Sequence, residues 1–284
     1  LRLDGSLGEG GGQVLRTALG LSLVTGQPFA IDKIRAGRKQ PGLARQHLTA
    51  VLAAAAVGQA EVEGAELGST SLRFRPRGIR AGEHRFAVGT AGSTTLVLQT
   101  VLPALLCADV PSAVTLSGGT HNPLAPSFDF LQQVFAPVLR RMGAGLDLTL
   151  RRHGFAPAGG GEFVATITPG RLAPIELRER TAAAPRRARV LIANLPNQIA
   201  ERELRTVRSR LDVHPDHCRI ERVDAAGPGN VLLLELAADP CGELIAVQGE
   251  RRVTAEQVAE RASAQAIAWL AADVPVGDTW PTSC

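Results

Sequence analysis

A glycine-rich segment close to the N-terminus runs directly into an apolar stretch with helical spacing. It reads Gly8-Glu9-Gly10-Gly11-Gly12-Gln13, and Arg16 follows within the first turn. Free N–H groups at a helix start, together with the helix dipole, favour a phosphate. The segment lacks the Lys-Ser/Thr pair of a P-loop, so a phosphate site and a simple tight turn are equally good interpretations here. Glu9 could hold a divalent cation, or be an exposed carboxylate.

A basic loop follows at residues 35–47. It carries four cations and a histidine: Arg35, Arg38, Lys39, Arg45 and His47. Guanidinium groups suit the bidentate recognition of phosphate oxygens, and Pro41-Gly42 would fix the direction of the turn. The sequence therefore indicates a phosphate-binding loop, with a solvated basic loop as the alternative.

Two further places carry polar groups that could do chemistry. Gln99 lies within an apolar run, where a buried carboxamide needs partners, so it either bridges core groups or contacts a ligand. The segment Asp212-x-His214-x-x-His217-Cys218 resembles a metal-ligand spacing. Pro215 and the expected loop setting argue against a metal there.

The elements that position these residues occur twice along the chain. Gly11 and Gly92 are 81 residues apart, and Gly37–Gly119 and Pro41–Pro123 are each separated by 82. Each copy is predicted to hold two helices and about four strands, which is an α/β layered arrangement. The second copy has lost the arginines, because its equivalent loop reads Thr120-His-Asn-Pro-Leu-Ala-Pro126. One copy therefore suits a charged ligand group and the other a neutral one.

A third copy is predicted to begin near residues 146–151, with a strand at 163–168, but its helices do not follow. Residues 178–270 show a different pattern, with helices at 197–211 and 254–272 and strands at 190–193, 231–237 and 243–248. We therefore expect an α/β fold built from a large repeat-built domain at 1–177 and 271–284, whose third unit is incomplete, and a smaller inserted α/β domain at 178–270.

Composition places the chain among folded proteins. The 284 residues are 45% hydrophobic and carry a formal net charge of +4, which is compatible with a phosphate-bearing partner. The four cysteines form no C-x-x-C pair, which indicates a reducing compartment and no thiolate zinc site. No signal peptide is visible, and the longest apolar run, at 96–107, is too short to span a bilayer. A cytoplasmic location is expected.

Together these motifs resemble the RNA 3′-terminal phosphate cyclases over residues 1 to about 277. The matching segments in the N-terminal half are Leu3-Asp4-Gly5, Gly8 to Arg16, Ile34 to Arg38, Gly42 to Leu48, Gly92-Ser93, Leu98-Gln99-Thr100, Ser117 to Thr120 and Asn122-Pro123. Further matches are His153-Gly154-Phe155-Ala156-Pro157-Ala158-Gly159-Gly160-Gly161 and Gly227-Pro228-Gly229-Asn230.

The resemblance implies an ATP-dependent ligase that converts an RNA 3′-phosphate into a 2′,3′-cyclic phosphate through adenylated intermediates. It implies that Glu9 binds the divalent metal, Mg²⁺ or Mn²⁺, on ATP. Gln13 and Arg16 are expected at the ATP phosphates, and Gln99 and Pro126 at the adenosine. The group expected at the RNA end or the triphosphate is Arg35, Arg38, Gln46 and His47.

The family's nucleophilic histidine is expected near the C-terminus, but no histidine follows His217 here. The family pattern stops after Val276-Gly277-Asp278, which we interpret as a truncated or frameshifted end. An incomplete third unit would leave an open sheet edge, so a homodimer that covers it is expected. Two alternatives stay open: a non-catalytic RNA-binding member of the ribosome-biogenesis type, and a small-molecule transferase of related fold.

Overall fold

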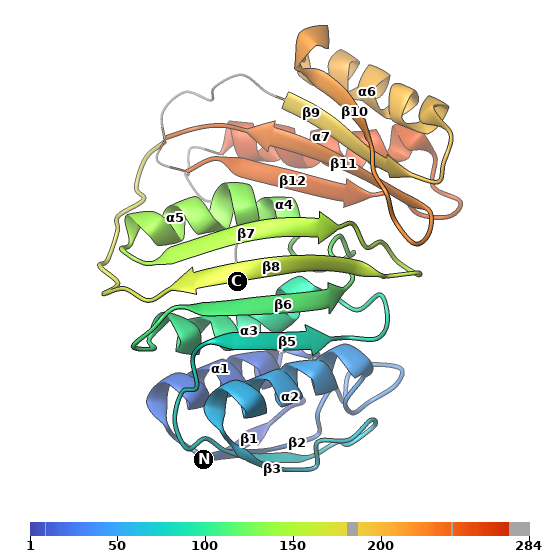
Figure 1. Cartoon of the computed structure of the whole chain (residues 1–284). Helices are drawn as coiled ribbons and strands as arrows, with labels where there is room; N and C mark the ends of the chain where they lie inside the picture. Colours follow the sequence, from blue (N-terminus) through green and yellow to red (C-terminus); the bar gives the residue numbers. More distant parts are fainter. Residues whose placement is uncertain (9, 181–186, 240, 273–284) are drawn as a thin grey trace.

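The computed structural model describes residues 1–8, 10–180, 187–239 and 241–272. It contains three four-stranded sheets with helices packed on them. The sheets follow one another in chain order from the bottom to the top of Figure 1. No helix in the described ranges is long and apolar enough to cross a membrane.

The first sheet and its two helices form one βαβαββ unit. Its elements are β1 (Arg2–Asp4), α1 (Gln13–Thr25), β2 (Phe29–Asp32), α2 (Arg45–Gly58), β3 (Glu61–Glu63) and β4 (Leu72–Arg75). The strand order is β1-β2-β4-β3, with β1 parallel to β2 and the other pairs antiparallel.

The second sheet repeats this order and these strand directions. Its elements are β5 (Glu83–Ala87), α3 (Thr94–Leu106), β6 (Ser112–Gly118), α4 (Phe128–Phe130), a π-helical turn (Leu131–Phe135), α5 (Ala136–Arg141), β7 (Gly145–Arg152) and β8 (Gly161–Thr168). The strand order β5-β6-β8-β7, with β5 parallel to β6, copies β1-β2-β4-β3. The predicted α/β fold of repeated units is confirmed.

The sequence misplaced both ends of the second unit. It predicts a strand at 84–88 as the last strand of the first unit, but this segment forms β5, which pairs with β6. β7 and β8, expected to open a third unit, pair with each other and with β6, and so complete the second sheet. The physical reason is burial: Phe163, Ala165 and Ile167 of β8 alternate inward and pack in the same core as β6. No third βαβαββ copy occurs within the described residues.

The third sheet has another topology. Its elements are β9 (Arg187–Ala193), α6 (Asn197–Leu211), a 3-10 turn (Pro215–His217), β10 (Cys218–Arg222), β11 (Gly229–Leu236), β12 (Glu243–Gln248) and α7 (Ala255–Ala271). The strand order is β10-β9-β11-β12. A capping box between Thr254 and Gln257 begins α7. Helices α6 and α7 cover one face of this sheet with their own apolar cluster. The domain boundary at 177/178 stays a prediction.

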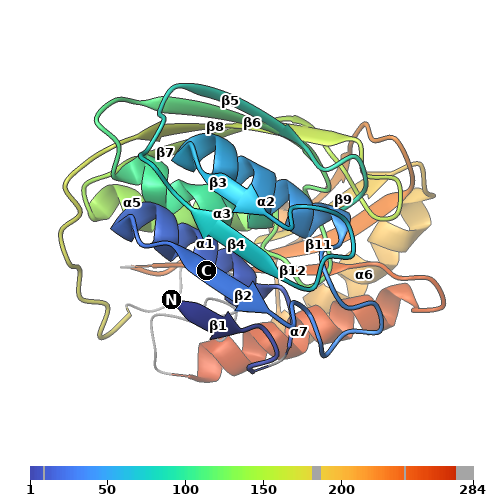
Figure 2. The same cartoon turned by 90° about the horizontal axis from the view of Figure 1, so that it is seen from below.

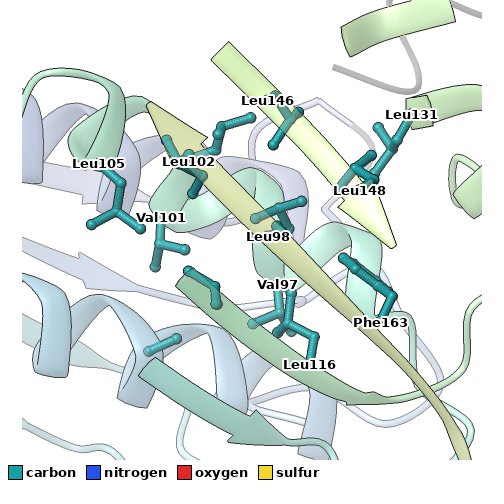
Figure 3. Close-up of a cluster of buried hydrophobic side chains, with 14 of the residues drawn as sticks. Val97, Leu98, Val101, Leu102, Leu105, Leu116, Leu131, Leu146, Leu148 and Phe163 are labelled. Atoms are coloured by element: carbon teal, nitrogen blue, oxygen red, sulfur yellow. The ribbon is translucent and has the colours of Figure 1, made fainter. Parts of the chain in front are cut away.

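Helix α3 is the centre of the main core. It is apolar on every side, as expected of a buried helix, and contacts α1 and α2 of the first unit and β6 and β8 of the second. Figure 3 shows Val97, Leu98 and Val101 of α3 beside Leu116 and Phe163 of the second sheet. Figure 2 shows α1, α2 and α3 grouped between the strands of the two units. The two repeats therefore share one core, which fixes their helix starts relative to each other.

Candidate functional site

Glycines bring the start of α1 against the basic loop. A Cβ on Gly12 would lie 2.2 Å from Nε2 of His47, and a Cβ on Gly11 would lie 2.9 Å from a guanidinium nitrogen of Arg38. Gly10 has a φ of +56° and would meet the backbone of Gly37 at 2.8 Å. Only glycine allows this approach, so the two predicted phosphate-binding segments form one site. Glu9, the expected metal ligand, lies outside the described residues.

Arg16 connects the two repeats at the floor of the site. Its side chain donates to the amide oxygen of Gln13 and, at 3.4 Å, to that of Gln99 on α3. The residue is only 8% exposed, and burial lowers the pKa of the guanidinium to about 10. Burying a cation is costly unless an anion pairs with it, and the amide oxygens that accept from Arg16 carry no net charge. The buried guanidinium therefore favours an anion beside it.

Arg35 shapes the basic loop. Its φ is +55°, and its guanidinium donates to the carbonyl groups of Gln40 and Gly42 at 3.0 and 2.7 Å. These bonds hold the turn closed, which predicts a positioning role besides any contact with a ligand. Burial and the nearby charge of Arg38 lower the pKa of Arg35.

His47 stands in the first turn of α2, among the cations. Burial lowers its pKa to about 4, and the charges of Arg35, Arg16 and Arg38 add to the effect. The imidazole is therefore neutral at physiological pH. Its Nδ1 is buried without a hydrogen-bond partner among the described residues.

The other predicted site residues belong to the link between the repeats. The Oε1 of Gln46 accepts from the backbone N–H of Ser93 at 2.7 Å, so this oxygen holds the start of α3. The carbonyl of Pro126 accepts from Thr95, which lies one helical turn before Gln99. Pro126 therefore lies against the face of α3 that carries Thr95 and Gln99. Pro126 itself is buried.

The helix starts of the two repeats are capped differently. Helices α1 and α2 begin on Gly12 and Ala44, with no side-chain cap. Helices α3 and α4 begin on Ser93 and Ser127, whose hydroxyls accept the N–H groups that an anion would otherwise bind. Both open helix starts therefore lie in the first unit, where the arginines are.

A buried polar chain beside the site was missed at the sequence level. His121, predicted only as part of a neutral loop, is bonded to Asp129, and Asp129 is bonded to Arg189 of the third sheet. The loop pattern gave no signal for Arg189, which is 60 residues from Asp129.

Two other features lie apart from the arginines. Within the described ranges no group of three or more His, Cys, Asp or Glu side chains could hold a metal, and His214 pairs with Asp216 at 3.4 Å on the surface.

An apolar cavity of about 410 Å³ lies along α1. Gln13 lines this cavity and also accepts from Arg16, so it connects the cavity with the site.

The fold and the site define an α/β protein built from duplicated βαβαββ units, with a cluster of arginines beside the starts of α1 and α2. A profile of the RNA 3′-terminal phosphate cyclase family matches residues 7–273, and the chain belongs to this family. It is 55% identical over 279 residues to a protein of Pseudomonas fluorescens named RNA 3′-terminal phosphate cyclase, with 98% of this chain and 81% of the relative covered.

Two further relatives carry the same name. The protein of Koribacter versatilis is 52% identical over 271 residues, which cover 95% of this chain and 76% of the relative. That of Ralstonia nicotianae is 53% identical over 272 residues, which cover 95% and 78%. The resemblance drawn from the motifs is confirmed.

Proposed function

We propose that this site binds ATP and the 3′-phosphate end of an RNA, the two substrates of an ATP-dependent RNA 3′-phosphate cyclase of the ligase class. The product of that reaction is a 2′,3′-cyclic phosphate. The unpaired thiols of Cys107, Cys218 and Cys241 fit a reducing cytoplasmic setting.

The observation that carries the proposal is the meeting of two open helix starts with buried positive charge. Arg16, Arg35 and Arg38 lie close enough to His47 for their charges to lower its pKa. Two or more phosphate groups would neutralise this cluster and accept the free N–H groups of α1 and α2. The triphosphate of ATP, bound beside an RNA 3′-phosphate, would supply these phosphate groups.

Each residue then has a proposed role. The start of α1 with Gln13 and Arg16 holds the ATP phosphates, and Gln99 with Pro126 faces the adenosine. Arg35 and Arg38, which lie beside Gln46 and His47, hold the RNA phosphate next to it. Positioning of this kind, together with fixed positive charge, favours displacement at phosphorus. Glu9 is the proposed ligand of Mg²⁺ or Mn²⁺.

The covalent step needs a nucleophile that takes AMP from ATP with release of pyrophosphate. AMP then passes to the RNA 3′-phosphate, and it leaves when the neighbouring 2′-hydroxyl attacks to close the cyclic phosphate. Among the described residues, His47 is the histidine whose pKa is lowered by the charges of Arg16, Arg35 and Arg38. The Nε2 of His47 faces Gly12 and its Nδ1 is buried, so neither nitrogen is presented to a phosphorus atom. We therefore propose recognition of both substrates by this chain, without adenylation of His47.

The experiment is an intact-mass measurement of the protein after incubation with ATP and Mg²⁺, alongside calorimetric titration with ATP. We expect saturable ATP binding and an unchanged protein mass. A mass increase of one AMP that maps to His47 would contradict the role given to that histidine. Absence of any ATP binding would remove the proposed function itself.

A second candidate is a non-catalytic RNA-binding member of the family. It is favoured by the same buried geometry of His47, the histidine that lies among the arginines of the site. RNA binding that is identical for 3′-phosphate and 3′-hydroxyl ends, and unaffected by ATP, would support it over the cyclase proposal. Retention of Gln13, Arg16 and Gln99 in one hydrogen-bonded group favours the nucleotide site.

A further inference from the structure

A buried chain of polar groups connects the third sheet to the loop at residues 119–126, which links β6 to α4. In it, Asp129 of α4 bonds through one oxygen to Nε2 of His121 at 2.7 Å and through the other to Arg189 of β9 at 2.8 Å. Arg189 also donates to Glu235 of β11 and Glu221 of β10, at 2.5 and 3.2 Å. The chain thus crosses between two sheets.

Burial makes these contacts strong and their loss consequential. The side chains of His121, Asp129 and Arg189 are 0%, 10% and 18% exposed. Burial alone would raise the pKa of Asp129, but the hydrogen bonds and charges of His121 and Arg189 outweigh it and bring the pKa down to about 2. Asp129 is therefore a carboxylate that depends on both partners.

His121 fixes the base of the 119–126 loop. Its Nδ1 is 2.8 Å from the hydroxyl of Thr120, and that hydroxyl accepts the N–H of Gly154 at 2.9 Å. The next residue, Asn122, donates its side-chain amide to the carbonyl of Ala91, in the turn before α3. The loop tip is otherwise open, with Leu124 96% exposed. The buried base, and not the tip, sets the path of the loop.

The same loop reaches the predicted nucleotide residues. The carbonyl of Pro126 accepts from Thr95 at 2.8 Å, and the hydroxyl of Thr95 is 2.7 Å from that of Ser93. Ser93 is in turn bonded to Gln46. A shift at the base of the loop would therefore move Pro126 relative to Gln99, one turn further along α3.

We propose that Asp129 and Arg189 are positioning residues for the nucleotide subsite, and that they act through His121 on the loop that carries Pro126. The third sheet, which holds none of the predicted site residues, thereby becomes a support for ATP binding. This inference rests on the proposed function, because it takes Pro126 to face the adenosine. It predicts that ATP affinity depends on a charge pair made across two sheets.

The test compares D129N, R189M and R189K with the wild-type protein. Binding of ATP with Mg²⁺ and of a short 3′-phosphorylated RNA is measured for each, together with the unfolding temperature. We expect D129N and R189M to weaken ATP binding on the order of tenfold, the scale found when partners that orient a ligand-binding group are removed. RNA binding at Arg35 and Arg38 should keep its wild-type value, and R189K, which keeps the charge, should recover part of the ATP affinity.

A matched control is R202M, which removes the Arg202–Glu256 pair between α6 and α7 and changes no contact of the 119–126 loop. It should leave both affinities unchanged. Wild-type ATP affinity in a folded R189M would overturn the inference, as would an equal loss of ATP and RNA binding, which marks a general structural role. If D129N does not fold, R189M and R189K decide alone. Failure of the wild-type protein to bind ATP would instead overturn the proposed function.

Discussion

Arg16 donates to the side-chain oxygen of Gln99 across 83 residues of sequence, at 3.4 Å. The two residues stand on α1 of the first repeat and α3 of the second, and both helices are fixed by the shared core. The proposed nucleotide site is therefore a product of the duplication, since neither repeat contains both groups. Arg16 supplies the charge, and Gln99 holds it in place without neutralising it.

Replacing Arg16 by methionine should abolish most ATP binding with little loss of stability. Methionine fills the buried space, while the removed guanidinium is a buried cation that donates to the amide oxygens of Gln13 and Gln99. Calorimetric titration with ATP checks this. The control is R75M, which changes an exposed arginine of β4 outside the basic loop and should bind ATP as the wild type does. Equal affinities of R16M and R75M would contradict the account.

Replacing Gly12 by alanine should destabilise the fold by about 1–3 kcal/mol, the range for overpacked sites, and weaken ATP binding. The backbone of Gly12 is in an ordinary helical conformation, so the effect comes from the 2.2 Å approach of its new Cβ to His47. Urea unfolding measures the loss. In G78A the nearest atom would be 3.8 Å away, so that variant should behave as the wild type.

Because Glu203 is buried, the free energy of unfolding should fall as the pH rises towards neutrality. Burial raises its pKa from 4.5 to about 7, and its Oε1 has no hydrogen-bond partner among the described residues. A raised pKa in the folded state means that stability is complete below pH 4.5 and is lost as the pH passes through about 7. E203Q should therefore exceed the wild type at pH 8 by on the order of 2 kcal/mol, and match it at low pH.

The control for Glu203 is E201Q on the exposed side of the same helix, which should not alter the pH dependence. Urea unfolding of the three proteins across the pH range gives the comparison. A difference between E203Q and the wild type that is constant with pH would show that Glu203 does not titrate in this range.

Added salt should weaken RNA binding, and the steepness of the loss should report the number of phosphate contacts. Counterion release gives a linear fall of log affinity with log salt, with a slope that changes by about one for each phosphate contact removed. R38M should therefore show a shallower slope than the wild type. The exposed Arg75 of β4 is not among the predicted site residues, and R75M should leave the slope unchanged. Identical slopes for R38M and the wild type would place Arg38 outside the interface.

The sequence predicted the repeat, both glycine-dependent turns and the basic loop, because these depend on local chemistry and fixed spacing. It misplaced the strands now labelled β5, β7 and β8, since short strands of one composition can join either neighbouring sheet and only pairing decides. It could not predict the bond between Asp129 and Arg189, which exists only after two sheets pack. For the same reason, the sequence could not predict that the side-chain oxygen of Gln46 accepts a hydrogen bond from the backbone N–H of Ser93.

The most direct test of the central claim is the affinity of one short RNA with a 3′-phosphate compared with the same RNA with a 3′-hydroxyl, measured at a single moderate salt concentration. The account predicts clearly tighter binding of the phosphorylated end, and a loss of that difference when Arg35 and Arg38 are replaced together by methionine. Equal affinity of the two RNAs for the wild-type protein would contradict it.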